Sequence, residues 1–205
     1  MAIELINIDC MAYMATLPDK AFELAIVDPP YRDKNDPTED MRNNGSMISI
    51  KGKPSPKYFD ELKRISKNQI IWGANNFQLS QFMGFVVWDK VMPQNFTMSM
   101  AEIASLSEGL GTISKIFKLR ISQLEDRIHP TQKPVALYRW LLHNYAKPGD
   151  RILDTHLGSG SSAIAAHQMG FDFVGCELEF TRRRHIFFSF SLGGLSIKFR
   201  KYNSM

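Results

Sequence analysis

Short apolar runs separated by polar breaks recur along the chain, and each run has the length of a buried strand. These runs predict strands over residues 3–9, 22–27, 68–72, 84–88, 151–154 and 171–177. A weaker alternation of apolar and polar positions over 101–107 predicts an edge strand. Residues 109–127 have a mixed pattern that defines no element.

Between these runs, apolar residues recur at the spacing of a helix. They predict helices over 11–17, 55–65, 135–146 and 161–169, and a short helical turn over 76–82. The polar stretch 32–54 is predicted to be a long loop. Strands that alternate with helices indicate an α/β fold with a mostly parallel, doubly wound sheet.

The composition is that of a soluble globular protein of one domain, with 44% hydrophobic and 22% charged residues among 205. No apolar run is as long as a membrane span, and the N-terminus lacks a basic segment followed by an apolar one. We therefore expect a cytoplasmic protein without contact to a membrane. Cys10 and Cys176 lie in or beside predicted strands and are expected to be reduced, buried thiols.

The charge is distributed unevenly along the chain. The net charge is +4, but residues 180–205 contain six basic residues and no acidic one, so the preceding residues carry −2. The high isoelectric point is therefore no argument for nucleic-acid binding by itself. A basic surface for DNA would have to be a local patch, or the C-terminal segment.

Asp28-Pro29-Pro30-Tyr31 follows the predicted strand 22–27. Proline fixes φ and removes a backbone donor, so this corner is rigid and leaves carbonyl groups free to accept. A carboxylate, a carbonyl and an aromatic ring could together bind one planar ligand. An ordinary turn at the end of a strand explains the same four residues equally well.

A second motif begins at Asp154 and continues as Thr155-His156-Leu157-Gly158-Ser159-Gly160 into a helix. A strand, a glycine loop and a helix bring backbone N–H groups up to a ligand. Glu177 ends the next predicted strand, where an acidic residue commonly binds ribose hydroxyls. The motif predicts a nucleoside-cofactor site. It also fits a dinucleotide-dependent dehydrogenase, or a glycine turn beside a solvated glutamate.

The motif Asp28–Tyr31, the segment His129-Pro130-Thr131-Gln132-Lys133-Pro134 and the motif from Asp154 to Gly160, in this order, resemble the amino-methyltransferases of DNA. The resemblance is to adenine-N6 enzymes whose catalytic motif precedes the cofactor motif, and it runs from about residue 3 to 179. It implies a three-layer, Rossmann-like methyltransferase fold with a permuted order of motifs. It also implies S-adenosylmethionine as cofactor and no metal.

The resemblance also implies roles for individual residues. Asp28 and the Pro29 carbonyl would accept hydrogen bonds from the adenine amine, and Tyr31 would stack on a base flipped out of double-stranded DNA. Gln132 and Lys133 would border the methionine carboxylate, although Lys133 could equally be a solvated lysine at a helix entry. The implied catalytic set is Asp28, Pro29, Pro30 and Tyr31, and the implied cofactor-binding set is Asp9, Cys10, Gln132, Lys133, Asp154, Thr155, His156, Gly158, Ser159, Gly160 and Glu177. Of these, His156 is expected to be a packing residue.

Target recognition is expected from the loop 32–54 and from residues 90–127 within a methyltransferase domain spanning 1–179. A homodimer and a cognate restriction endonuclease are left open. The resemblance implies a bacterial or phage-borne enzyme.

Residues 180–205 depart from the family pattern, because this basic, Phe-rich tail replaces an expected acidic helix. A frameshift in the gene is our hypothesis for the tail, and a native divergent tail is the alternative. The competing functions are methylation of cytosine N4 and a catalytically impaired remnant that still binds DNA or S-adenosylmethionine.

Overall fold

The computed structural model describes residues 1–31, 34–35, 50–79, 82–93, 95, 99–120, 132–178 and 197–201. For residues 34–35, 50–51 and 197–201 it describes the backbone only. The predicted recognition loop 32–54 and most of the tail therefore lie largely outside the described residues.

One sheet organises the described part of the chain, with nine strands in the order β11-β1-β10-β9-β2-β5-β7-β6-β8. Only β7 runs against the others, because it pairs antiparallel with both β5 and β6. The strands are β1 (Ile3–Asn7), β2 (Phe22–Val27), β5 (Ser66–Trp72), β6 (Gly84–Asp89), β7 (Ala101–Leu106), β8 (Lys115–Lys118), β9 (Arg151–Asp154), β10 (Asp172–Glu177) and β11 (Ile197–Lys201). A separate antiparallel pair joins β3 (Lys34–Asn35) to β4 (Ile50–Lys51).

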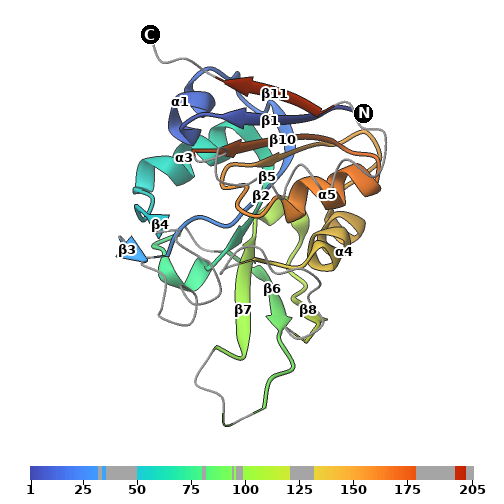
Figure 1. Ribbon diagram of the computed structural model, residues 1–205. Coiled ribbons are helices and arrows are strands. Elements are labelled where there is room, and N and C mark those ends of the chain that lie inside the picture. Colours follow the sequence, from blue (N-terminus) through green and yellow to red (C-terminus); the bar gives the residue numbers. More distant parts are fainter. Residues whose placement is uncertain are drawn as a thin grey trace, which may run out of the picture.

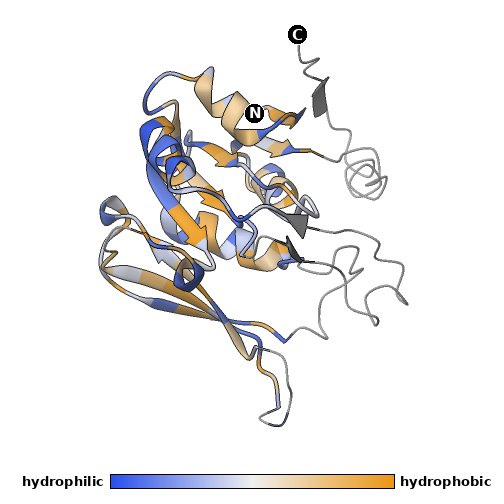
Figure 2. Ribbon diagram, turned by 90° about the vertical axis from the view of Figure 1, so that its left-hand side faces the viewer, coloured by the Kyte–Doolittle hydropathy of each residue, from blue (hydrophilic) through white to orange (hydrophobic). Residues whose placement is uncertain are grey.

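Helices cover both faces of the sheet and make the fold three-layered (Figure 1). Helices α1 (Cys10–Ala15) and α3 (Pro56–Ile65) pack over one hydrophobic core. Helices α4 (Val135–Tyr145) and α5 (Ser161–Gln168) pack over the other. Because successive strand residues point to opposite faces, Leu24 and Ile26 join the second core while Ala25 and Val27 join the first. Figure 2 shows the hydrophobic residues concentrated on the strands between the helices. The predicted three-layer Rossmann-like fold is confirmed.

The strands and helices at the two motifs agree with the sequence prediction to within a few residues, but three details were wrong. The expected edge strand 101–107 is β7, which lies inside the sheet with a partner on each side. The edge is β8, within a stretch for which no element was predicted, because a lysine stands at each of its ends and none of its residues is fully buried. The helical turn predicted over 76–82 is a 3₁₀ turn at Ala74–Asn76.

The parallel strands bring both motifs to one edge of the sheet, namely the edge at which the carboxyl ends of β1, β2, β5, β9 and β10 meet. Asp9 follows β1, Asp28 follows β2 and Thr155 follows β9. Since β7 is antiparallel, its first residues, including Glu102, lie at this same edge.

Among the described helices, none combines the length and the apolar character needed to cross a membrane.

Candidate active site

The corner after β2 is held together by hydrogen bonds to both carboxylate oxygens of Asp28. The Tyr31 hydroxyl donates to Oδ1 at 2.6 Å, and the Lys133 ammonium lies 2.5 Å from Oδ2. Lys133 Nζ is also 3.3 Å from the Tyr31 hydroxyl oxygen. Each carboxylate oxygen keeps further lone pairs, so Asp28 can still accept from a ligand.

Gly73, at the end of β5, makes room for the Tyr31 ring. A Cβ atom at this position would lie 2.1 Å from Cε1 of Tyr31, and the φ angle of Gly73 is +67°. Both the close approach and the left-handed backbone therefore require glycine. Phe77 packs edge-on against the same ring, with 6.1 Å between ring centroids.

Lys133 is almost completely buried, with 4% of its surface exposed. Besides Asp28, it pairs with Glu102 at 3.0 Å, and its ammonium lies 5.2 Å from the centroid of the Trp72 ring. Burial alone would lower the pKa of Lys133, but Asp28 and Glu102 raise it well above its usual value. The alternative of a solvated lysine is therefore wrong.

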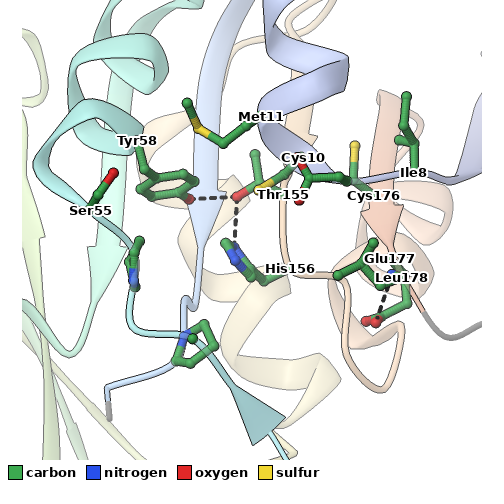
Figure 3. A pocket seen from close by; sticks show the side chains of 14 residues that line it. Ile8, Cys10, Met11, Ser55, Tyr58, Thr155, His156, Cys176, Glu177 and Leu178 are labelled. Atoms are coloured by element: carbon green, nitrogen blue, oxygen red, sulfur yellow. Dashed lines mark hydrogen bonds between the residues drawn. The ribbon is translucent and has the colours of Figure 1, made fainter. Parts of the chain in front are cut away.

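A cavity of about 290 Å³ opens beside this corner (Figure 3). This volume is close to the lower end of the range for ligand pockets, roughly 300–1,000 Å³. Pro30 of the corner borders the cavity. The other lining residues come from the segment after β1, the entry to α3 and the ends of β9 and β10: Ile8, Asp9, Cys10, Met11, Gly52, Pro54, Ser55, Tyr58, Thr155, His156, Cys176, Glu177 and Leu178.

Glu177 ties the glycine loop to the end of β10. Its Oε2 accepts from the backbone N–H of Gly158 at 3.0 Å, and its Oε1 accepts from that of Leu178 at 3.0 Å. Gly158 and Gly160 have φ angles of +55° and +80°, which permit the tight turn into α5. The Glu177 carboxylate thus borders the cavity in a fixed orientation.

Asp154 supports the loop from the inside and does not line the cavity. Its Oδ2 accepts from the Ser162 hydroxyl at 2.6 Å, and its Oδ1 accepts from the His156 backbone N–H at 2.9 Å. Burial raises the pKa of Asp154 to about 7, although these two hydrogen bonds act in the opposite direction. Ser159 adds a hydroxyl contact of 3.0 Å to Ser161 within the same turn.

Thr155 connects the loop to α3. Its hydroxyl lies 2.6 Å from that of Tyr58 and 3.0 Å from Nδ1 of His156 (Figure 3). Burial lowers the pKa of His156 to about 4, so the imidazole is neutral at pH 7. His156 also packs edge-on against Tyr58, with 5.4 Å between ring centroids. These contacts agree with the packing role expected for His156.

Both cysteines are free thiols and face the cavity. Burial, followed by the charge of Asp9, raises the pKa of Cys10 to about 12, and burial raises the pKa of Cys176. Cys176 is buried as expected, whereas Cys10 is only partly buried, so the expectation of two buried thiols was wrong for Cys10. Among the described residues, no group of three or more His, Cys, Asp or Glu side chains could hold a metal ion.

The structure divides the expected site residues among three places. Six of them line the cavity: Asp9, Cys10, Pro30, Thr155, His156 and Glu177. Asp154, Gly158, Ser159 and Gly160 form the turn that supports it. Lys133 instead contacts Asp28, while Gln132 is half-buried just before it.

Sequence reasoning missed four residues of this region, namely Gly73, Lys90, Glu102 and Tyr58. Tyr58 stands within the helix predicted over 55–65, and the partner of its hydroxyl, Thr155, is 97 positions away in the chain. The pattern of a single sequence carries no signal for such distant pairs. Gly73 directly follows the strand predicted over 68–72, and Lys90 lies two positions after the strand predicted over 84–88.

Comparison with known proteins identifies the family. A sequence model of the N6/N4 DNA methylase family matches residues 61–187, which is more than half of the chain and extends into the predicted tail. The YubD protein of Escherichia coli (strain K12) is 29% identical over 199 residues, covering 83% of this chain and 82% of that protein. The type II methyltransferase M.HinfI of Haemophilus influenzae is 24% identical over 229 residues, covering 83% of this chain but only 63% of that enzyme.

Solved structures share the fold. TTHA0409 of Thermus thermophilus, in complex with S-adenosyl-L-methionine, superimposes with a TM-score of 0.64 at 14% identity and covers 100% of both chains. The cytosine-N4-specific PvuII DNA methyltransferase superimposes with a TM-score of 0.67 at 11% identity, covering 96% of this chain and 89% of that one. S-adenosylmethionine is the methyl donor of the matched family. The chain belongs to the N6/N4 family of DNA methyltransferases.

Proposed function

We propose that the protein transfers a methyl group from S-adenosylmethionine to the N6 amino group of adenine at a specific site in double-stranded DNA. The observation that carries this proposal is that Pro30 borders the cavity while Asp28, two positions away, presents a fixed carboxylate. A donor in the cavity and an amine at the corner would thus lie next to each other.

The cavity suits the nucleoside part of this cofactor. Carboxylates of Asp9 and Glu177 are placed to accept from ribose hydroxyls or an adenine amine, and Ile8, Met11 and Cys176 offer apolar surface to a flat ring. S-adenosylmethionine supplies an electrophilic methyl group on a sulfonium when it is bound. The proposed roles of Gln132 and Lys133 at the methionine carboxylate would require Lys133 to leave Asp28.

The corner suits an exocyclic amine. The lone pair of such an amine is delocalised into the base, and acceptors for both N–H groups would localise it toward the methyl carbon. Asp28 and the Pro29 carbonyl supply acceptors, and Tyr31 supplies a ring on which a flipped base can stack. The rest of the rate enhancement would come from positioning the reactants in a site that excludes water.

DNA would approach the edge of the sheet at which the strands β2, β5 and β9 end. The chain leaves β6 after Asp89 and β8 after Lys118 at this edge, which supports a role of residues 90–127 in target recognition. We include the loop 32–54 in the same role, since it directly follows Tyr31.

Methylation of cytosine N4 is the second candidate, because the matched family joins both chemistries. The amine of cytosine makes the same demands on the corner. Asp28 favours adenine, because the resemblance implies that cytosine-N4 enzymes more often carry serine at this position. A remnant that binds the cofactor without turnover is the third candidate, motivated by the tail.

Nucleoside mass spectrometry of DNA from a methylase-deficient bacterial host separates these candidates. The host would express the wild-type chain, Asp28→Ala, or Asp60→Ala as a matched control at an exposed position of α3. We expect N6-methyladenine with the wild type and the control, and none with Asp28→Ala. N4-methylcytosine would overturn the choice of base, and no methylated base from soluble protein would favour the remnant.

A further inference from the structure

Four charged side chains form one chain of contacts that ends at the proposed catalytic carboxylate. Lys90 Nζ lies 2.7 Å from Oε1 of Glu102, and Lys133 Nζ lies 3.0 Å from Oε2 of the same glutamate. Lys133 then reaches Asp28 at 2.5 Å. No motif of the sequence joins these residues, and Glu102 has no role in the function proposed above.

Separate elements position the four residues. Lys90 follows β6, and its backbone N–H donates to the carbonyl of Met100. Glu102 stands on β7 directly opposite Trp88 of β6. Lys133 stands just before α4, 31 positions after Glu102 in the chain. The contact chain therefore ties the strands β2, β6 and β7 and the entry to α4 together at one point.

The burial of these charges is acceptable only because they compensate one another. Lys90 and Lys133 are 7% and 4% exposed, and a buried ammonium without a partner is strongly unfavourable. Two cations and two carboxylates make the group formally neutral. Burial on its own would raise the pKa of Glu102, but Lys133 and Lys90 lower it to about 2, so Glu102 is ionised at pH 7.

The contact with Glu102 limits the positions that the Lys133 ammonium can take beside Asp28. Lys133 is shared between two carboxylates, so its ammonium cannot move freely toward either one. Asp28 in turn is fixed by Tyr31 on one oxygen and Lys133 on the other. The direction of the lone pairs that remain for a substrate amine therefore depends on where Glu102 holds Lys133.

We propose that Glu102, backed by Lys90, is a positioning residue that orients the Asp28 carboxylate through Lys133. This inference rests on the proposed methyl transfer, in which Asp28 accepts the substrate amine. Without Glu102, Lys133 pairs with Asp28 alone, which turns the carboxylate and weakens it as an acceptor for the amine.

Steady-state kinetics with purified Glu102→Gln tests the proposal. We expect kcat to fall about 10- to 100-fold, the size of effect that a misplaced catalytic group produces, while KM for S-adenosylmethionine and DNA stays close to wild type. Glu102→Asp, which keeps the charge, should recover part of kcat. Glu108→Gln, an exposed glutamate on the neighbouring turn, is the matched control and should behave as wild type. A wild-type kcat in Glu102→Gln would overturn the proposal.

The double variant Lys90→Gln with Glu102→Gln separates positioning from simple neutralisation. It removes one cation and one anion, so the remaining Lys133–Asp28 pair is balanced and the fold is not left with an uncompensated charge. Positioning predicts that kcat stays low in this double variant. Recovery of the wild-type kcat would show that Glu102 only balances charge, and would overturn the proposal.

A thermal measurement tests the contact chain without any activity. Either carboxylate alone can partner Lys133, so Asp28→Asn combined with Glu102→Gln should lower Tm by more than the sum of the two single variants. Additive shifts would contradict a shared lysine and overturn the proposal. A wild-type protein that transfers no methyl group would refute the proposed function, while this cycle would still decide whether Glu102 acts on Asp28.

Discussion

Tyr31 can hold Asp28 only because the chain leaves no side chain at Gly73. The tyrosine ring fills the space that a Cβ atom of residue 73 would occupy. Gly73 directly follows β5 and has a left-handed backbone conformation. Burial raises the pKa of Tyr31, so its hydroxyl remains a proton donor to Asp28 at neutral pH. A glycine outside both motifs thus shapes the Asp28 corner.

Gly73→Ala should therefore displace Tyr31 and loosen Asp28. We expect a loss of about 2–4 kcal/mol in the free energy of unfolding, from left-handed strain and overpacking together. Binding of S-adenosylmethionine should persist, since Gly73 does not line the cavity. Urea unfolding and calorimetric titration measure the two quantities.

Gly170→Ala is the control for backbone strain in this experiment. Its φ angle is +80°, but a Cβ atom there would meet nothing within 4 Å. We expect this variant to lose only the strain of about 1–2 kcal/mol. Equal losses at both glycines would show that the Tyr31 ring can move aside without cost.

His156 makes the stability of the fold sensitive to acid. Its pKa in the folded protein is about 4, below the value of about 6.5 in an unfolded chain, so the unfolded state binds more protons between these values. The part of the stability that depends on neutral His156 is fully present above pH 6.5 and is lost as the pH falls toward 4. The loss attributable to His156 is on the order of 3 kcal/mol at most.

His156→Gln should remove this part of the acid sensitivity. Free energies of unfolding measured from pH 7 down to pH 4 should fall less steeply in the variant than in the wild type. The exposed His143→Gln serves as the control and should follow the wild-type curve. Parallel curves for wild type and His156→Gln would mean that the imidazole is not desolvated.

At the scale of elements, the sequence identified those that carry the motifs because their apolar runs are strong and end in Asp or Gly. Strand β2 was predicted with its observed bounds, and so was β9. Strand β8 was not predicted because it is short and flanked by lysines, with Ile116 and Lys118 exposed. Strand β7 was predicted at the sheet edge because weak alternation is typical of an edge strand. Which strands become neighbours depends on packing, which a local pattern does not contain.

Strand β11 is an element that the family resemblance did not lead us to expect. It lies in the basic tail and pairs parallel with β1, from Ile3 opposite Ile197 to Asn7 opposite Lys201. Without it, β1 would be an edge strand with unpaired backbone groups. Part of the tail is thus built into the sheet that carries Asp9.

A chain that ends at residue 196 should therefore expose β1. We expect amide hydrogen exchange of residues 3–7 to become at least about tenfold faster, because the N–H groups directed toward β11 lose their partners. Peptides from β2 and β5, inside the sheet, provide the internal control. Unchanged exchange in residues 3–7 would show that β11 does not protect β1 in solution.

At the scale of the whole molecule, the order of motifs predicted the fold and the family well, because each motif follows a strand whose carboxyl end lies at the same edge. The arrangement of charges was beyond prediction. Lys133 was assigned to the cofactor, but it meets Asp28 and Glu102, which stand 105 and 31 positions away in the chain. Such a network depends on the packing of α4 against the sheet, and the local pattern of apolar and polar residues does not predict it.

The central claim is that the cavity and the Asp28 corner work as one site for amino methylation of DNA. Transfer of labelled methyl groups from S-adenosylmethionine to unmethylated duplex DNA by the purified protein tests it most directly. The account predicts transfer by the wild type and by Asp60→Ala, and none by Asp28→Ala although this variant still binds the cofactor. Undiminished transfer by Asp28→Ala would contradict it.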